Sequence, residues 1–330
     1  MKNDSFVDFT WHVPGGGYRW TKAKTPNTDG PESEPRWTLV PATDDDQKDR
    51  PYRRHRLRDE HAGLFRTFAD LTSSKDSILM FANLHGSLSA RPIRQPTRDA
   101  GEANHHTPVN DPLEEWKRQI AALHQVIAIW NLVQAKDAER LRHYFKTSKS
   151  DKWVRVIFDS HPDEANVPPL GTLRVQRMIA ALKVQRDQSP QIDINDVFTR
   201  AYLYLCELMD QHLPKRVTPC LVQDSDSDRP QLRVIPDQLI DAIWMQAAEA
   251  ISSNRVFHSC RGCGKWLEIA RGTARTTRLF CSSVCRNRFY RDRQDQAREM
   301  AAAGKSVAAI AVELGADVGA VKNWVKTEEE

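Results

Sequence analysis

The chain has 330 residues, of which 40% are hydrophobic, and its formal net charge is only +4. This length allows one sizeable core with one or two small modules, and no apolar run approaches the roughly 18 residues that span a bilayer. Asp4 and Asp8 interrupt the amino-terminal stretch where a signal peptide needs uninterrupted apolar residues. We therefore expect a cytoplasmic protein without membrane association, whose thiols stay reduced.

We predict a weakly ordered amino-terminal region with short strands at residues 1–73. Two β-like pieces, at 6–13 and 35–41, are separated by glycine- and proline-rich stretches, and a block poor in apolar residues follows at 44–60. The sequence leaves open whether these pieces add edge strands to a sheet or form a tail.

Residues 74–254 are predicted to form a mixed α+β body that is mostly helical, and two helix starts in it carry clear signals. Ser73, with Asp76 three residues later, has the spacing of a capping box. Asp111 as N-cap and Pro112 at the first helical position begin a second helix, whose apolar residues recur every three or four positions. This seam indicates a helix that faces a core, although a dimerising coiled-coil strip has the same pattern.

Further elements of the same body follow from their apolar patterns. The predicted strands are residues 152–160, 216–222 and 232–237. The predicted helices are residues 195–213 and 236–252. Cys206 and Cys220 lie in apolar surroundings and are predicted to be buried. The body contains no phosphate-binding glycine loop, nucleophile elbow or His-Glu-x-x-His motif, so we do not expect an enzyme. We expect it to bind a small-molecule effector or to form a homodimer.

Four of the six cysteines fall in one short segment as two closely spaced pairs. Cys260 and Cys263 have the two-residue gap of a zinc knuckle, and Cys281 and Cys285 lie on one face if a helix begins near Ser282. Because all four ligands would be sulfur, the metal would have no open coordination position. We predict one structural Zn²⁺ per chain, held by these four cysteines.

The segment from Arg255 to Arg298 holds ten arginines and one lysine against three acidic residues, which leaves a net charge of +8. Such a concentration is typical of a surface that binds phosphates, although a solvated charged helix has the same composition. Four of these arginines could offset the negative charge of a zinc ion with four thiolates. They are Arg271, Arg275, Arg278 and Arg286.

A hairpin is predicted between the two cysteine pairs. Residues 266–269 and 276–280 are the expected strands, and 270–275, with the sequence ARGTAR, is the expected turn. A knuckle, a hairpin and a helix that carries the last ligands together make a treble clef.

The stretch from Cys260 to Arg293 resembles the CGNR zinc finger, which is named for a Cys-Gly-Asn-Arg signature at its fourth ligand. That family occurs in bacterial proteins taken to be transcriptional regulators, many with an amino-terminal regulatory domain. Here the signature reads Cys285-Arg286-Asn287-Arg288, so Arg286 replaces the glycine while the other three residues match. The resemblance implies a DNA-binding zinc finger at residues 255–293.

The helix that starts near the last cysteine is expected to fold Phe289 back onto the knuckle and to present one polar face. That face comprises Asn287, Tyr290, Arg291, Gln294 and Arg298. Arginine pairs bidentately with guanine or phosphate, and asparagine pairs with adenine. The residues expected to contact DNA in this region are Arg286, Asn287, Arg288, Tyr290, Arg291 and Arg293.

Residues 294–330 are predicted to form a helix-turn-helix. Ser306 caps one short helix, Gly315 ends it and Asp317 caps the next. The pattern resembles the resolvase-like helix-turn-helix, although a helical hairpin packed on the body would share it. The resemblance places Lys322, Asn323 and Lys326 on the exposed face of a recognition helix.

The zinc-finger helix is expected to run into the helix-turn-helix without interruption. Residues 294–303 contain no helix breaker, so one rod should extend from Cys285 to Gly304. Such a rod would fix the two DNA-contacting surfaces relative to each other.

Together these patterns predict a sequence-specific DNA-binding transcription regulator that binds double-stranded DNA and associates with the nucleoid. The alternative is a zinc-finger adaptor that binds RNA or protein, because one fold serves many partners. An enzyme such as a nuclease would need clustered carboxylates or an unligated histidine near the finger. His258 is the one histidine there, and the sequence offers it no partner.

Overall fold

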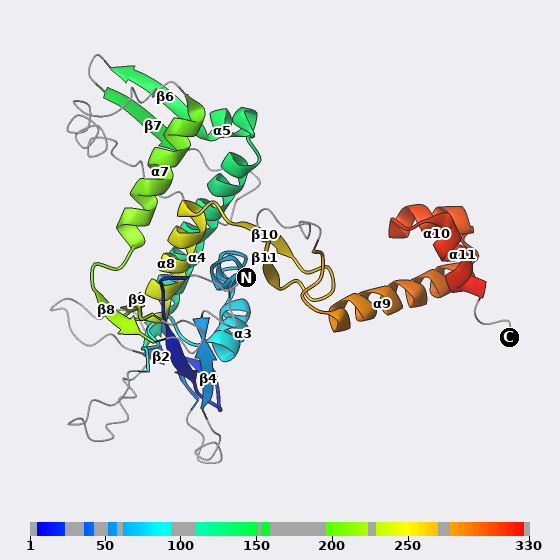
Figure 1. Ribbon diagram of the computed structural model, residues 1–330, viewed down its shortest axis with the longest axis horizontal. Coiled ribbons are helices and arrows are strands. Elements are labelled where there is room, and N and C mark those ends of the chain that lie inside the picture. The colour runs from blue at the N-terminus through cyan, green and yellow to red at the C-terminus, as the bar shows by residue number, and fades with distance from the viewer. Residues whose placement is uncertain are drawn as a thin grey trace. The chain divides into compact units, whose positions relative to one another are not determined.

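The protein was analysed as a computed structural model, which describes part of the chain (Figure 1). The described residues are 5–23, 36–42, 52–57, 62–93, 110–150, 153–158, 196–223, 229–269 and 278–326, with the backbone alone at 146–150 and 153–158. The chain divides into two compact units, Met1–Asn254 and Arg255–Glu330. Helices and strands both contribute to the structure, in agreement with the predicted α+β class. Among the described helices, none combines the length and apolar character needed to cross a membrane.

The first unit contains nine described strands, all short and paired in antiparallel fashion. They are β1 (Thr10–Val13), β2 (Tyr18–Ala23), β3 (Arg36–Pro41), β4 (Arg53–Arg56), β5 (Asp111–Pro112), β6 (Phe145–Ser150), β7 (Trp153–Phe158), β8 (Val217–Val222) and β9 (Gln231–Pro236). The strands form the pairs β1–β4, β6–β7 and β8–β9 and a three-stranded sheet in the order β2–β3–β5. The strands predicted around residues 152–160, 216–222 and 232–237 are thus confirmed as β7, β8 and β9.

Six described helices complete the first unit. They are α2 (Leu64–Ala69), α3 (Lys75–His85), α4 (Leu113–Gln134), α5 (Ala138–Tyr144), α7 (Val197–His212) and α8 (Leu239–Ser252). Helices α2, α4, α7 and α8 supply much of the core, and the two helices predicted at residues 195–213 and 236–252 are confirmed as α7 and α8. The apolar seam of α4 is buried, as expected of a core-facing helix.

Four tryptophans lie completely inside the first unit: Trp11, Trp116, Trp130 and Trp244. Each large aromatic ring removes about 150–250 Å² of surface from water, so these side chains contribute strongly to folding. The indole N–H of Trp11 donates to the carbonyl of His85 at 2.7 Å, and that of Trp244 donates to Oε1 of Gln119 at 2.7 Å. Burial of these two rings therefore leaves their polar atoms paired.

Within residues 1–73, predicted to be weakly ordered, the described segments include buried side chains. Short strands are present where expected, but the described side chains of Phe9, Trp11, Leu39 and Phe68 are fully buried in the first unit. The sequence pattern concealed this because each strand is short and its partners come from distant parts of the chain.

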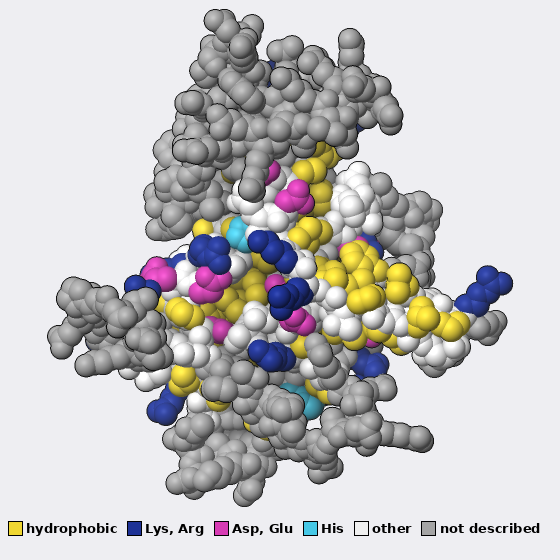
Figure 2. All heavy atoms as spheres, turned by 90° about the vertical axis from the view of Figure 1, so that its left-hand side faces the viewer, with side chains coloured by type: hydrophobic (Ala, Val, Ile, Leu, Met, Phe, Trp, Pro, Cys, Tyr) yellow, Lys and Arg dark blue, Asp and Glu magenta, His cyan; other side chains and the backbone are white. Residues whose placement is uncertain are grey.

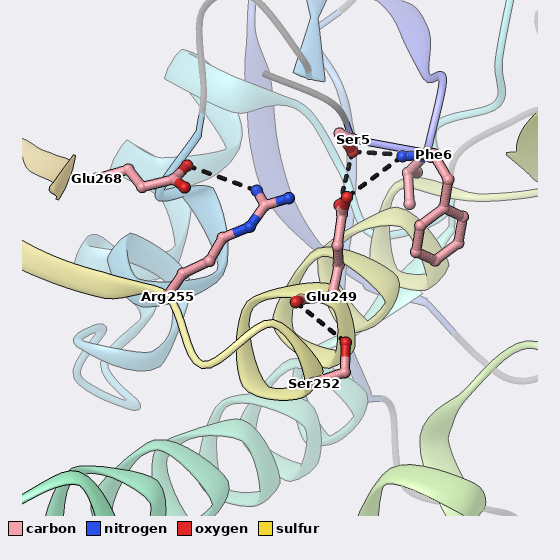
Figure 3. A network of polar contacts seen from close by, with 7 residues as sticks. Ser5, Phe6, Glu249, Ser252, Arg255 and Glu268 are labelled. Atoms are coloured by element: carbon pink, nitrogen blue, oxygen red, sulfur yellow. Dashed lines mark hydrogen bonds and ion pairs between the residues drawn. The ribbon is translucent and has the colours of Figure 1, made fainter. Parts of the chain in front are cut away.

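The beginning of the described chain is anchored to α8 by a buried carboxylate (Figure 3). The hydroxyl of Ser5 donates to Oε2 of Glu249 at 2.6 Å, and the backbone N–H of Phe6 donates to Oε1 at 3.2 Å. The backbone at Phe6 and Asp8 also exchanges hydrogen bonds with Val234 of β9, at 2.8 and 3.0 Å. These contacts hold residues 5–8 against the body.

Both predicted helix starts are displaced by one residue. The cap of α3 is Ser74, whose hydroxyl accepts from the N–H of Ser77 at 3.2 Å, and not Ser73. The N-cap of α4 is Pro112, because Asp111 pairs with Leu39 of β3 and its side chain is buried. Burial raises the pKa of Asp111, although hydrogen bonds from Ser89 and Leu88 act in the opposite direction. A tertiary contact has displaced the local capping preference here.

The prediction that Cys206 and Cys220 are buried is wrong: Cys206 is exposed and Cys220 is half-buried. The buried stripe of α7 includes Tyr204, Leu205, Leu208 and Met209. Cys206 lies about 100° further round the helix than Leu205, and therefore outside that stripe.

The charged side chains on one face of the molecule do not form a patch of a single sign. Figure 2 shows Lys, Arg, Asp and Glu side chains interspersed there around exposed hydrophobic groups. Mixed charge of this kind is ordinary for a protein surface and does not favour phosphate binding on that face.

His212, at the end of α7, stacks on the buried ring of Trp244 with centroids 4.3 Å apart and an interplanar angle of 11°. Burial and the nearby charge of Arg118 lower the pKa of His212 from 6.5 to about 4. Between these values the unfolded chain binds a proton that the folded chain does not, so His212 makes stability fall as the pH is lowered through this window. We expect His212→Phe, which keeps an aromatic ring there, to lose less stability between pH 7 and pH 5 than the parent in urea denaturation. An equal loss in both proteins would contradict the assignment.

The described residues of the second unit form one hairpin and three helices. Its elements are β10 (Val256–Ser259), β11 (Trp266–Ile269), α9 (Ser283–Ala302), α10 (Val307–Leu314) and α11 (Val318–Lys326). Arg255, directly before β10, forms an ion pair of 3.5 Å with Glu268 on β11 (Figure 3). Helix α9 runs unbroken across the predicted boundary between residues 293 and 294, which confirms the expected continuous helix.

Candidate metal centre and nucleic-acid interface

The first cysteine pair lies in the turn of the β10–β11 hairpin. Ser259 pairs with Trp266, and the backbone N–H of Cys260 donates to the carbonyl of Lys265 at 2.8 Å. The N–H of Gly264 then donates to the carbonyl of Cys260 at 2.8 Å, and Gly264 adopts a φ of +72° that strongly favours glycine. Cys263 lies between these contacts, so a tight turn brings both thiols to one side.

This hairpin differs from the predicted one. Residues 266–269 pair with β10, which precedes the first cysteine, and residues 278–280 are described without strand structure. The predicted turn at 270–275 lies outside the described residues. The sequence pattern indicated the wrong partner for residues 266–269, because their true partner strand, at residues 256–259, is only four residues long.

The second cysteine pair lies at the amino terminus of α9. Ser282 is the N-cap, and its hydroxyl accepts from the N–H of Cys285 at 3.2 Å, as a helix beginning near Ser282 requires. Cys281 immediately precedes the cap and Cys285 is the third residue of the helix. The positive end of the helix dipole therefore lies beside this pair, where it favours thiolates.

The four thiols converge on one point. Their sulfur atoms all lie within 4.8 Å of one another, with 3.6 Å between Cys263 and Cys281 and 3.2 Å between Cys281 and Cys285. Disulfide sulfurs are bonded at about 2.05 Å, so these are four free thiols. Four sulfurs each about 2.3 Å from a central zinc would lie about 3.8 Å apart. The cluster thus has the dimensions of a metal site with four sulfur ligands.

Gly262 permits the close approach of the two cysteine pairs. A Cβ atom at this position would lie 2.7 Å from the carbonyl oxygen of Cys285 and 3.1 Å from its Cβ. The N–H of Arg261 donates to the carbonyl of Leu279 at 3.0 Å, and the N–H of Cys281 donates to Sγ of Cys260 at 3.3 Å. These contacts join the turn to the segment that carries the second cysteine pair.

We expect Gly262→Ala to weaken metal binding at least tenfold, because the added methyl group would collide with backbone at the last ligand. Competition with a chromophoric zinc chelator measures this effect in the full chain. Arg261→Ala is the matched control, since that neighbouring side chain is exposed. Equal metal affinity in Gly262→Ala and the control would exclude a role for the close approach.

The surroundings divide the thiols into those that ionise readily and those that do not. Burial raises the pKa of Cys260, but backbone N–H groups of Cys281, Gly262 and Cys263 outweigh it and bring the pKa to about 6. Burial and the adjacent thiols of Cys285 and Cys263 raise the pKa of Cys281 to about 12. A bound cation would favour the thiolate form at all four positions.

An aromatic cluster supports the start of α9. The ring of Phe289 lies 5.2 Å from that of Phe280, which directly precedes Cys281, and Tyr290 lies 6.2 Å from Phe280. Phe289 therefore packs against the segment that carries the second cysteine pair. The ring was predicted to fold back onto the knuckle at Cys260 and Cys263, and its described ring contact is instead with the segment before Cys281.

The basic residues of the second unit fall into two groups. Arg286, Arg288 and Arg291 are exposed on α9, and no described residue forms a hydrogen bond or ion pair with their side chains. Arg278, in contrast, donates to the carbonyls of Phe280 at 3.1 Å and Cys281 at 2.6 Å. Arg271 and Arg275, which were also predicted to offset the thiolate charge, lie outside the described residues.

Two arginines expected on the polar or DNA-contacting face are instead engaged inside the unit. Arg293 donates to the carbonyl of Leu314, and Arg298 donates through Nε to the carbonyl of Trp324 at 3.2 Å. Arg298 also forms an ion pair of 2.9 Å with Asp295. The helical wheel placed Arg298 on the polar face and Arg293 was predicted to contact DNA, but the sequence did not reveal the carbonyls that the two side chains meet.

Helices α10 and α11 pack with the second half of α9 around a small core (Figure 1). Its buried residues are Ala297, Ile310, Ala311 and Val321. The predicted caps at Ser306 and Asp317 are confirmed, and Gly315 ends α10 with a left-handed φ of +58°. The remaining predicted DNA contacts, Asn287, Tyr290, Lys322, Asn323 and Lys326, are all exposed.

Comparisons of the chain with models of protein families, with curated proteins and with solved structures found no match. Sequence reasoning identified the four cysteines and the exposed basic residues, but it missed the roles of Gly262 and Arg293. The Cys-x-Gly-Cys spacing was a signal for the first, whereas no local signal distinguishes Arg293 from its exposed neighbours.

Proposed function

We propose that the second unit is the sequence-specific DNA-binding part of a transcription regulator, in which four cysteines hold one structural zinc ion. The observation that carries the proposal is the set of three exposed arginines without described partners, Arg286, Arg288 and Arg291, directly after the last cysteine. Side chains of this kind pair well with phosphate oxygens because the guanidinium donates two parallel hydrogen bonds.

Zinc is the metal that fits the cysteine cluster best. A compact set of four sulfur ligands is typical of zinc or of iron–sulfur sites, and the spacings of the two pairs favour zinc. The hairpin with the first cysteine pair in its turn, followed by the ligand-bearing helix, resembles a treble clef. With four thiolates bound, the ion would stabilise the fold and would not activate water.

The ends of α9 would give the protein two regions of contact with DNA. At its amino end lie the three arginines with Asn287 and Tyr290, and at its carboxyl end α10 and α11 form the proposed helix-turn-helix. Lys322 and Lys326 are exposed one turn apart on α11, the proposed recognition helix. The unbroken α9 would fix the distance between the two regions.

The net charge of +8 between Arg255 and Arg298 supports binding of this segment to DNA phosphates. The contacts from the three arginines would position the protein on DNA, and Asn287 and α11 would read bases. The first unit is expected to carry the sensing or dimerising role in the cytoplasm.

Selection of binding sites from a randomised duplex library tests this proposal. The full chain, loaded with zinc, should enrich a short common sequence over successive rounds. Enrichment without a common sequence would limit the protein to non-specific DNA binding. Failure to retain duplex DNA, together with retention of RNA or protein, would assign the second unit to the adaptor class.

A further inference from the structure

Arg293 connects the cysteine-bearing half of α9 with α10 and α11. Its guanidinium lies 5.4 Å from the ring centroid of Phe289 and 5.6 Å from that of Trp324. It also donates to the carbonyl of Leu314 at the end of α10. One side chain therefore contacts all three helices of the unit.

Phe289 connects Arg293 to the cysteine site through the ring of Phe280. Phe289 lies one helical turn after Cys285 on α9, and its ring packs on Phe280 at 5.2 Å. Phe280 immediately precedes Cys281, so the backbone that carries this ligand also carries the ring. A change in the position of the loop at Cys281 would move Phe280 away from Phe289.

Trp324 connects Arg293 to α11, the helix on which this tryptophan lies. The carbonyl of Trp324 accepts from Arg298, whose guanidinium is held by Asp295. Trp324 itself packs against the core around Val321. The orientation of α11 on α9 thus depends on Arg293 and Arg298, which both extend from α9.

We propose that Arg293 is a positioning residue that couples metal binding at the four cysteines to the packing of α10 and α11. Metal binding holds the loop at Cys281, the loop holds Phe280 on Phe289, and Phe289 keeps Arg293 in place against Trp324. Phe280 and Phe289 form a tilted aromatic pair, and Arg293 makes cation–π contacts with Phe289 and Trp324. Each contact is weak alone but cooperative within one small core. The inference rests on the proposed metal site and is independent of DNA binding.

Hydrogen exchange of the full chain, followed by mass spectrometry, tests the coupling without DNA. Removal of zinc by a chelator should speed exchange of peptides from residues 307–326 roughly three- to tenfold in the parent protein. In Arg293→Met these peptides should exchange faster even with zinc bound, and the chelator should add little. Arg293→Lys keeps the charge but not the flat guanidinium, and it should give an intermediate result.

Arg291→Met is the matched control, because Arg291 lies on the same helix and is exposed. Its peptides at 307–326 should respond to the chelator like those of the parent. Two results would overturn the inference: unchanged exchange at 307–326 in the parent after confirmed loss of zinc, or equal behaviour of Arg291→Met and Arg293→Met. Neither result would bear on DNA binding, which the selection of binding sites measures separately.

Discussion

Replacement of Cys263 by Ser is expected to abolish stable zinc binding and to unfold the cysteine-bearing part of the second unit. Structural zinc contributes about 10–16 kcal/mol to the folding of small zinc-finger peptides, and loss of one thiolate removes much of this free energy. The hairpin turn and the first turn of α9 have few buried apolar groups to replace it. The first unit has its own core around four tryptophans and should remain folded.

Metal content by mass spectrometry and protease sensitivity of residues 255–293 measure this effect. Cys206→Ser is the matched control, because Cys206 is exposed on α7 and does not belong to the cluster. The control should bind one zinc ion per chain like the parent. Full zinc occupancy and unchanged protease resistance in Cys263→Ser would contradict a structural four-cysteine site.

The second large effect is expected when Arg286, Arg288 and Arg291 are all replaced by alanine. If each contacts one phosphate, the slope of log K against log salt should become less negative by about 2.7, and affinity at moderate salt should fall roughly 10- to 100-fold. The fold should survive, because these side chains are exposed.

Lys305→Ala provides a control of the same charge type, since the ammonium group of Lys305 pairs with Glu313 at 2.7 Å. Its salt slope should match that of the parent. Fluorescence anisotropy with a labelled random duplex gives both slopes. An unchanged slope in the triple variant would remove α9 from the DNA interface.

The cysteine cluster was the part of the protein that could be predicted best. Cysteine spacing is a local property, so the two pairs and the helix start at Ser282 were predictable from the sequence. Gly264 was predictable for the same reason, because its positive φ belongs to the turn itself. The Cys-x-Gly-Cys spacing marks Gly262, but its close approach to Cys285 was not predictable, because Cys285 lies on another element.

Long-range contacts explain the other differences between prediction and structure. Asp111 has every local feature of an N-cap, but pairing with β3 buries it and moves the start of α4 by one residue. The amino-terminal strands were hard to recognise from the sequence because this region packs on α3 and pairs with β9, which lie far away in the chain. Arg293 lies among arginines of identical local character, and only the position of Trp324 distinguishes it.

The most direct test of DNA binding by the second unit is the salt dependence of affinity for duplex DNA, measured with the zinc-loaded full chain. With Arg286, Arg288, Arg291, Lys322 and Lys326 each on one phosphate, the slope of log K against log salt should be about −4.5. A slope near zero, or no measurable binding at low salt, would contradict the proposed function and assign the exposed arginines to another partner.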